Sequence, residues 1–89
     1  MLVLIALASG PRHGHAMLHD IAAFAGIRLG PGTLYGAIER LEQDGLIEAL
    51  DEDDRRVPYR LPRAGQDHLR HRLGELTVLL SVARERVGA

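Results

Sequence analysis

Apolar residues along this chain recur mostly at helical spacing, with a short region of alternation past the middle. The helical spacing predicts helices in residues 2–8, 14–25, 31–44 and 64 to near the end of the chain. Gly10, Gly26 and Gly45 closely follow the first three, because glycine readily ends a helix. Pro31 opens the third helix, at a position where its missing N–H costs no hydrogen bond.

The alternating region predicts two short strands, in residues 46–50 and 57–61, joined by the charged turn 51–56. Pro58 cannot donate to a strand ladder, so we expect its nitrogen to face outward or to lie at the start of its strand. A hairpin that directly follows a helix is typical of the wing in a winged helix-turn-helix.

The second and third helices are separated only by the connector 26–30, which fits a helix-turn-helix. The predicted fold class is mainly α with a small two-stranded β-hairpin, in which a winged helix-turn-helix precedes a C-terminal dimerisation helix. Residues 1–62 are expected to form the DNA-binding domain and residues 63–89 the dimerisation helix, within one structural unit.

The third helix has one apolar face and one slim, polar face. Leu34, Ile38 and Leu41 define the apolar side. A helix anchored in this way presents small and polar groups outward, as a recognition helix must in order to enter a DNA major groove. An ordinary amphipathic helix has the same pattern, so this stretch alone leaves both interpretations open. The outward positions are Thr33, Tyr35, Gly36, Glu39, Arg40 and Gln43.

Arginines in the predicted wing are candidates for contacts with the phosphate backbone. They are Arg55, Arg56 and Arg60. The acidic stretch 51–54 would repel phosphate, so internal pairing of these charges is the alternative. Outside the wing, Arg28 in the connector and His15 near the start of the second helix are further candidate DNA contacts.

The last helix carries apolar residues at spacings of four, three, four, three and four, the pattern of a coiled-coil seam. The seam consists of Leu69, Leu73, Leu76, Leu80, Ala83 and Val87. It could pack only on this chain's own first helix, but a chain of 89 residues has little else to cover both helices. We therefore predict a homodimer, whose interface also includes Leu2, Leu4 and Ile5 of the first helix.

Composition limits the classes of function. The chain is 46% hydrophobic and only 3% aromatic, which predicts one folded domain with an aliphatic core. The net charge of −1 gives nucleic-acid binding no general support, although all eleven basic residues are arginine, which favours bidentate contacts with phosphate or guanine. Without cysteine, disulfides and thiolate chemistry are excluded.

Other chemistry receives little support from the sequence. His15 and His19 are spaced i,i+4, and His68 and His71 i,i+3, but no third ligand follows at a recognisable spacing, so we expect no metal. No nucleophile context, phosphate-binding glycine loop or cofactor motif is apparent, so we expect no enzyme and no cofactor. The apolar residues 1–8 are too few to span a bilayer, and no basic residue precedes them as in a signal peptide.

Residues 4–14 combine an apolar first helix with the turn Pro11-Arg12-His13-Gly14. Three further segments follow: residues 29–35, which include Pro31-Gly32-Thr33-Leu34-Tyr35, the stretch 38–47, and Arg55-Arg56 with Tyr59-Arg60-Leu61 and Ala64-Gly65. In order and spacing these four segments span nearly the whole chain, and together they resemble the PadR family of bacterial transcriptional regulators. A single C-terminal helix resembles the short-tailed branch of that family.

The resemblance implies a cytoplasmic, homodimeric winged-helix repressor that binds an inverted-repeat operator in double-stranded DNA. It implies that Thr33 and Tyr35 contact phosphate or base edges, with Arg40 beside them. His15 replaces a tyrosine, Gly30 a serine and Pro62 a threonine that are common in the family, and the last two changes remove helix caps. A DNA-binding regulator that also takes an unknown small-molecule effector in the dimer groove is an alternative, although the chain has few aromatic residues to stack on such a ligand. The rival hypothesis is a winged helix used only for protein–protein contact, favoured by the net charge and the acidic turn.

Overall fold

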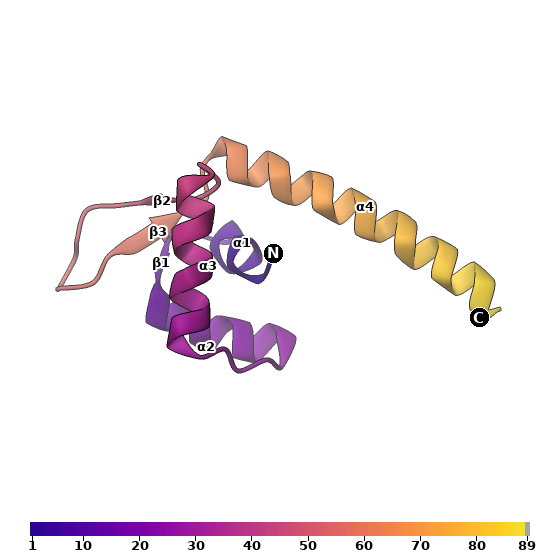
Figure 1. The fold of residues 1–89 in the computed structure, drawn as a ribbon, viewed down its shortest axis with the longest axis horizontal. Coiled ribbons are helices and arrows are strands. Elements are labelled where there is room, and N and C mark those ends of the chain that lie inside the picture. The colour runs from indigo at the N-terminus through magenta and orange to yellow at the C-terminus, as the bar shows by residue number, and fades with distance from the viewer. Residues whose placement is uncertain (89) are drawn as a thin grey trace.

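The computed structural model of this chain describes residues 1–88, which form four helices and a three-stranded antiparallel sheet at one side of them (Figure 1). Ala89, the last residue of the predicted dimerisation helix, lies outside the described residues. The elements in chain order are α1 (Leu2–Ala8), β1 (Arg12–His13), α2 (Gly14–Ala25), α3 (Pro31–Gln43), β2 (Glu48–Ala49), β3 (Pro58–Arg60) and α4 (Arg63–Val87). The mainly helical winged helix-turn-helix predicted from the sequence is confirmed.

The core is aliphatic and centres on α1, which contacts the other three helices. Leu4 of α1, Met17 of α2 and Leu34 of α3 are almost completely buried. Burial of such side chains stabilises the fold by about 1.5–3 kcal/mol each relative to leaving them exposed. The remaining core residues are Val3, Ala6, Leu7, Ile21, Ile38, Ile47, Leu61 and Leu69.

Helix ends follow the expected signals. Gly26 ends α2 with a left-handed φ of 67°, and Gly45 follows α3 with a φ of 73°. Pro31 is at the start of α3, and the N-cap Gly30 makes no side-chain capping bond. At α2 the cap is a histidine, because His13 Nδ1 accepts a hydrogen bond from the Ala16 N–H at 3.2 Å.

The sheet contains one more strand than the sequence analysis predicted. Its order is β1-β3-β2, with Arg12 opposite Tyr59 in one pair and Glu48 opposite Arg60 in the other. β1 has only two residues, too few for a pattern, and exists because the distant β3 pairs with it. Pro58 begins β3, as expected, and its carbonyl accepts a hydrogen bond from the Leu50 N–H at 2.8 Å.

The wing ends in a tight two-residue turn. Asp53 and Arg56 exchange backbone hydrogen bonds of 2.7 and 2.9 Å, and the two residues between them have left-handed φ angles, 50° at Asp54 and 65° at Arg55. Two left-handed central residues are the signature of a type I′ turn, whose twist matches that of the flanking strands. The predicted charged turn is therefore a hairpin tip (Figure 1).

α4 begins beside α1 and then extends away from the other helices and the sheet (Figure 1). The radius of gyration is 14.8 Å, against about 12 Å for a compact domain of this length. Gly65, in its first turn, packs directly against the backbone of Leu46, where a Cβ atom would overlap the carbonyl oxygen. The first part of α4 is thus fixed to the wing, whereas its C-terminal half has no neighbour within residues 1–88.

Two residues assigned to the dimer interface belong instead to the core of the single chain. Leu4 is 2% exposed and Leu69 is 7% exposed, because α1 and the start of α4 cover each other. The rest of the predicted seam is open, with Leu73, Leu76 and Leu80 each 41–51% exposed.

Within residues 1–88, no helix combines the length and the apolar character that crossing a membrane requires.

Candidate nucleic-acid interface

One face of α3 is buried against the core, and the opposite face is exposed. Leu34 and Ile38 are buried in the core, at 0% and 2% exposure. Gly36 has nothing within 4 Å of the position that a Cβ would occupy, so the outward face is low at that point. The exposed residues of this face are Thr33, Tyr35, Gly36, Glu39, Arg40 and Gln43, as the periodicity predicted.

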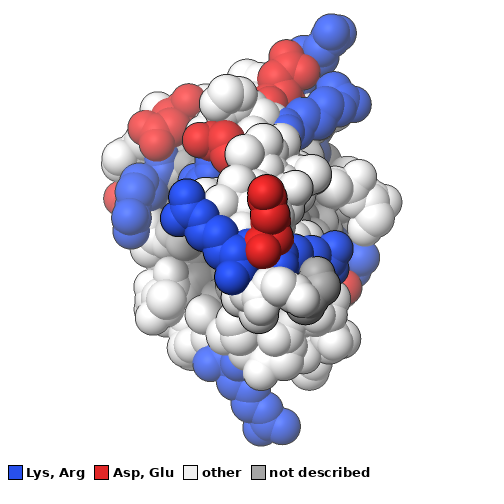
Figure 2. All heavy atoms as spheres, turned by 90° about the vertical axis from the view of Figure 1, so that its right-hand side faces the viewer, with Lys and Arg blue, Asp and Glu red and all other residues white. Residues whose placement is uncertain are grey.

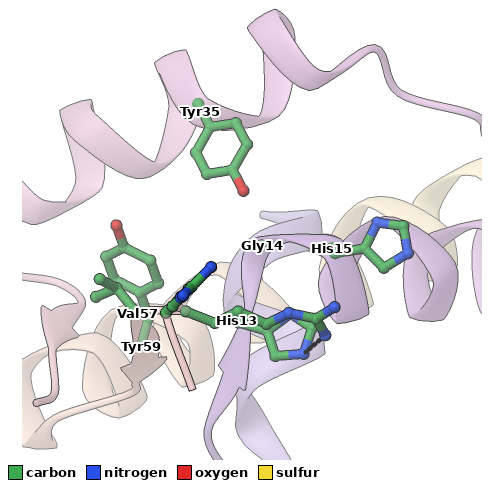
Figure 3. A pocket seen from close by; sticks show the side chains of 8 residues that line it. His13, Gly14, His15, Tyr35, Val57 and Tyr59 are labelled. Atoms are coloured by element: carbon green, nitrogen blue, oxygen red, sulfur yellow. Dashed lines mark hydrogen bonds between the residues drawn. The ribbon is translucent and has the colours of Figure 1, made fainter. Parts of the chain in front are cut away.

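Beside this face lies a cleft of about 310 Å³ between the start of α2, the start of α3 and the wing. In Figure 3, Tyr35 extends from α3 with its hydroxyl toward Gly14, and Tyr59 rises from the wing on the opposite side. The lining residues are His13, Gly14, His15, Tyr35, Arg55, Arg56, Val57 and Tyr59. The cleft thus joins residues more than forty positions apart, and four of them, His15, Tyr35, Arg55 and Arg56, were predicted as DNA contacts.

His13 connects the wing to α2. Its Nδ1 caps α2, and its Nε2 lies 3.1 Å from Nη1 of Arg56 at the wing tip. The neighbouring His15 ring is stacked at a centroid distance of 6.4 Å. The Arg56 guanidinium is therefore directed toward α2 and lines the cleft.

Tyr59 forms part of the same wall and is partly buried. Burial raises the pKa of its hydroxyl above 10.0, and the nearby Glu42 carboxylate and Tyr35 raise it further. The phenol is therefore neutral at physiological pH and able to donate a hydrogen bond.

Of the predicted contacts that are not on α3, two do not line the cleft. Arg60 forms an ion pair with Glu48 of the neighbouring strand. Because successive side chains of a strand point to opposite faces, Arg60 faces away from the side on which Tyr59 lines the cleft. Arg28 is exposed in the connector and lines a second hollow, together with His15 and His19.

Sequence reasoning did not assign Arg12, Gly14 or Tyr59 to this region. Arg12 ties β1 to α1 and α2, because its Nε–H donates a hydrogen bond to the Ala6 carbonyl at 2.9 Å and lies 3.7 Å from the Asp20 carboxylate. Of these three residues, only Gly14 carries a signal in the sequence, because a glycine can mark a place where another group approaches the backbone closely.

The histidines do not form a complete metal site in the described part of the chain, where no three His, Cys, Asp or Glu side chains are grouped suitably. His15 and His19 are the nearest to one, with their Nε2 atoms 3.2 Å apart. One ring can donate to the other at that distance, depending on the tautomers.

Charge is mixed on the side of the molecule toward the C-terminal end of α4. Figure 2 shows basic and acidic groups interspersed there, with a broad uncharged area below them. Such a surface attracts polyanions weakly compared with a cleft that has arginines and a helix N-terminus.

Known proteins share both the sequence and the fold. Residues 3–71 match the Transcriptional regulator PadR-like family. The chain is 51% identical over 69 residues to an uncharacterized 37.1 kDa protein in transposon TN4556 of Streptomyces fradiae, a match covering 78% of this chain. It spans only about a fifth of that relative's length, 20%.

Two solved structures show the same architecture. A PadR family transcription regulator from Clostridium difficile superposes with a TM-score of 0.88 at 22% identity, covering 97% of this chain and 94% of that one. A PadR family transcriptional regulator from Eggerthella lenta gives 0.82 at 28% identity, covering 97% and 80%. The family match covers most of the sequence, and the fold and family support a DNA-binding regulator. This chain belongs to the PadR-like family of transcriptional regulators.

Proposed function

We propose that this protein is a homodimeric repressor that binds an inverted-repeat operator in double-stranded DNA. The observation that carries the proposal is the continuity of the exposed face of α3 with the wing, across a cleft that contains Arg55 and Arg56. A recognition helix and a basic wing on one side of a domain can contact a major groove and its flanking phosphates together.

In this proposal α3 enters the major groove with its slim side forward. Gly36 lets the helix approach closely, while Arg40 and Gln43 are long enough to reach base edges. Thr33, Tyr35 and Arg28 contact the backbone at the N-terminal end of the helix, and His15 does so from α2. Glu39 shares this face and would accept from a cytosine amino group.

The wing contributes phosphate contacts through Arg55 and Arg56. Arg60 contributes less in this proposal, because Glu48 already neutralises its charge. The acidic residues 51–54 repel phosphate, so in this proposal the adjacent Arg55 and Arg56 carry this part of the interface.

The open seam of α4 supports a second copy of the chain as its occupant. Leu73, Leu76 and Leu80 continue the line of the buried Leu69, and Ala83 and Val87 extend it at the same spacing. A repeat of this kind is self-complementary, so two α4 helices cover each other. Leu2 and Ile5 of α1, which are half-buried against the core, extend the interface in this proposal.

Two domains related by a two-fold axis would read an operator with the same symmetry. Selection of bound fragments from genomic DNA, using the purified protein, tests this directly. We expect enriched sites with two inverted half-sites about one helical turn apart. Sites without internal symmetry would contradict the dimeric arrangement, and no enrichment over input would favour a protein–protein interaction module.

A further inference from the structure

The two polar contacts of the His13 ring require different tautomers of the imidazole. The Ala16 N–H donates to Nδ1, so that nitrogen must carry the lone pair. In a neutral imidazole the other nitrogen, Nε2, then carries the hydrogen. Yet Nε2 lies 3.1 Å from Nη1 of Arg56, which has only hydrogens to offer.

No protonation state of His13 removes this conflict. The other neutral tautomer would accept from Arg56 but would present an N–H to the Ala16 N–H. A protonated ring would present two donors, one to a guanidinium and one to the positive end of α2. The cleft is therefore one acceptor short, with two donors directed at the same point.

From this shortage we propose that the cleft holds one phosphate group, whose oxygens accept from both His13 Nε2 and Arg56. Phosphate oxygens only accept hydrogen bonds, and they bind most strongly to arginine and to the N-terminus of a helix. The eight lining residues include two arginines and no carboxylate. Tyr35 supplies a hydroxyl on the facing wall (Figure 3).

The position of the cleft indicates which phosphate it takes. It lies between α3 and the wing, the two elements that flank the backbone in the proposed complex. A phosphodiester of the bound duplex is therefore the occupant, and this inference rests on the proposed function. His13 acts as the second donor as well as the cap of α2, and binding fixes it in the tautomer that suits both roles.

Two substitutions isolate the phosphate contact from the fold. Arg56→Gln removes the charge. His13→Asn removes the Nε2 donor but retains a residue that caps helices well. Arg63→Gln is the charge-matched control, because Arg63 is 87% exposed at the start of α4 and lies away from the cleft.

Binding of a labelled mixed-sequence duplex to the full chain is measured against salt concentration. We expect Arg56→Gln to weaken binding roughly tenfold and to reduce the slope of log affinity against log salt by about one. His13→Asn should weaken binding several-fold without changing the slope, and its effect should largely disappear in the Arg56→Gln background. Arg63→Gln should leave the slope unchanged.

A second measurement follows the His13 ring nitrogens by two-bond ¹H–¹⁵N spectra as duplex, or inorganic phosphate against a matched chloride series, is added. We expect duplex to shift the His13 signals in the original protein and not in the Arg56→Gln variant. If phosphate alone has no effect, the site takes a phosphodiester of the duplex in preference to the free ion.

The outcomes separate the two proposals. If the unaltered protein binds duplex but Arg56→Gln keeps the full salt slope, or the two substitutions act additively, the phosphate site is wrong and the regulator stands. If no duplex binds, the regulator proposal fails and the phosphate titration decides the site. In that case shifted His13 signals support an anion site, and unshifted signals overturn it.

Discussion

The hydroxyl oxygen of Tyr35 lies 2.5 Å from the position that a Cβ atom would occupy on Gly14. The first residue of α2 must therefore be glycine if the Tyr35 ring is to keep its place over the helix N-terminus. One consequence is that a residue on the exposed face of α3 is positioned by the helix that precedes it.

Gly14→Ala should weaken operator binding without destabilising the fold. The added methyl group displaces the Tyr35 ring, whose far end can move, while alanine favours a helix over glycine by up to about 1 kcal/mol. Duplex affinity and urea unfolding measure the two effects separately. Tyr35→Ala should likewise lower affinity with the fold intact. An unchanged affinity in both variants would remove Tyr35 from the interface.

Leu76→Asp should convert the proposed dimer into a folded monomer. Leu76 is 41% exposed in the single chain, so the charge is tolerated there but not between two seams. Sedimentation velocity with circular dichroism reports assembly and folding together. Ser81→Asp, on the same helix but off the seam, is the matched control and should remain dimeric. A stable dimer of the Leu76 variant would place the interface elsewhere.

Gly65→Ala should be strongly destabilising, and Gly74→Ala on the same helix should not. A Cβ at Gly65 would overlap the Leu46 carbonyl oxygen and approach Leu61 Cδ1 to 2.5 Å, whereas nothing lies within 4 Å of a Cβ at Gly74. The first should lower the free energy of unfolding by about 1–3 kcal/mol or more, and the second should raise it by up to about 1 kcal/mol. Urea titrations of both variants measure this. Equal effects would show that α4 does not pack on the wing as described.

Arg55→Gly should increase stability and decrease duplex affinity. Arg55 has a φ of 65°, which costs a non-glycine residue about 1–2 kcal/mol. Glycine relieves this strain, but it also removes a charge from the cleft. Thermal unfolding and duplex binding should therefore change in opposite directions. A variant that loses stability would show that the left-handed φ at this position does not strain the hairpin tip.

Local signals predicted the helices well, and non-local contacts account for what the sequence could not predict. Gly26 and Pro31 mark helix ends through their own backbone preferences, so one sequence suffices to find them. β1 has two residues and depends on pairing with β3, more than forty positions away. The burial of Leu4 and Leu69 likewise depends on two helices from opposite ends of the chain covering each other.

In the candidate site, too, the features set by local sequence were predictable and those set by distant contacts were not. Periodicity placed Thr33, Gly36 and Gln43 on the outer face of α3, because a single helix decides that arrangement. The pairing of Arg60 with Glu48, and the approach of Arg56 to His13, arise only when the wing folds back. Charge along the sequence could identify these arginines as candidates but not which of them lines the cleft.

The salt dependence of duplex binding tests the central claim most directly. The protein is titrated onto a duplex from its own promoter region at a series of salt concentrations, with its folding and assembly monitored in the same buffers. The account predicts retention of the duplex at low salt and an affinity that falls steeply toward moderate salt, as phosphate contacts release counterions. A folded protein that retains no such duplex even at low salt would contradict it.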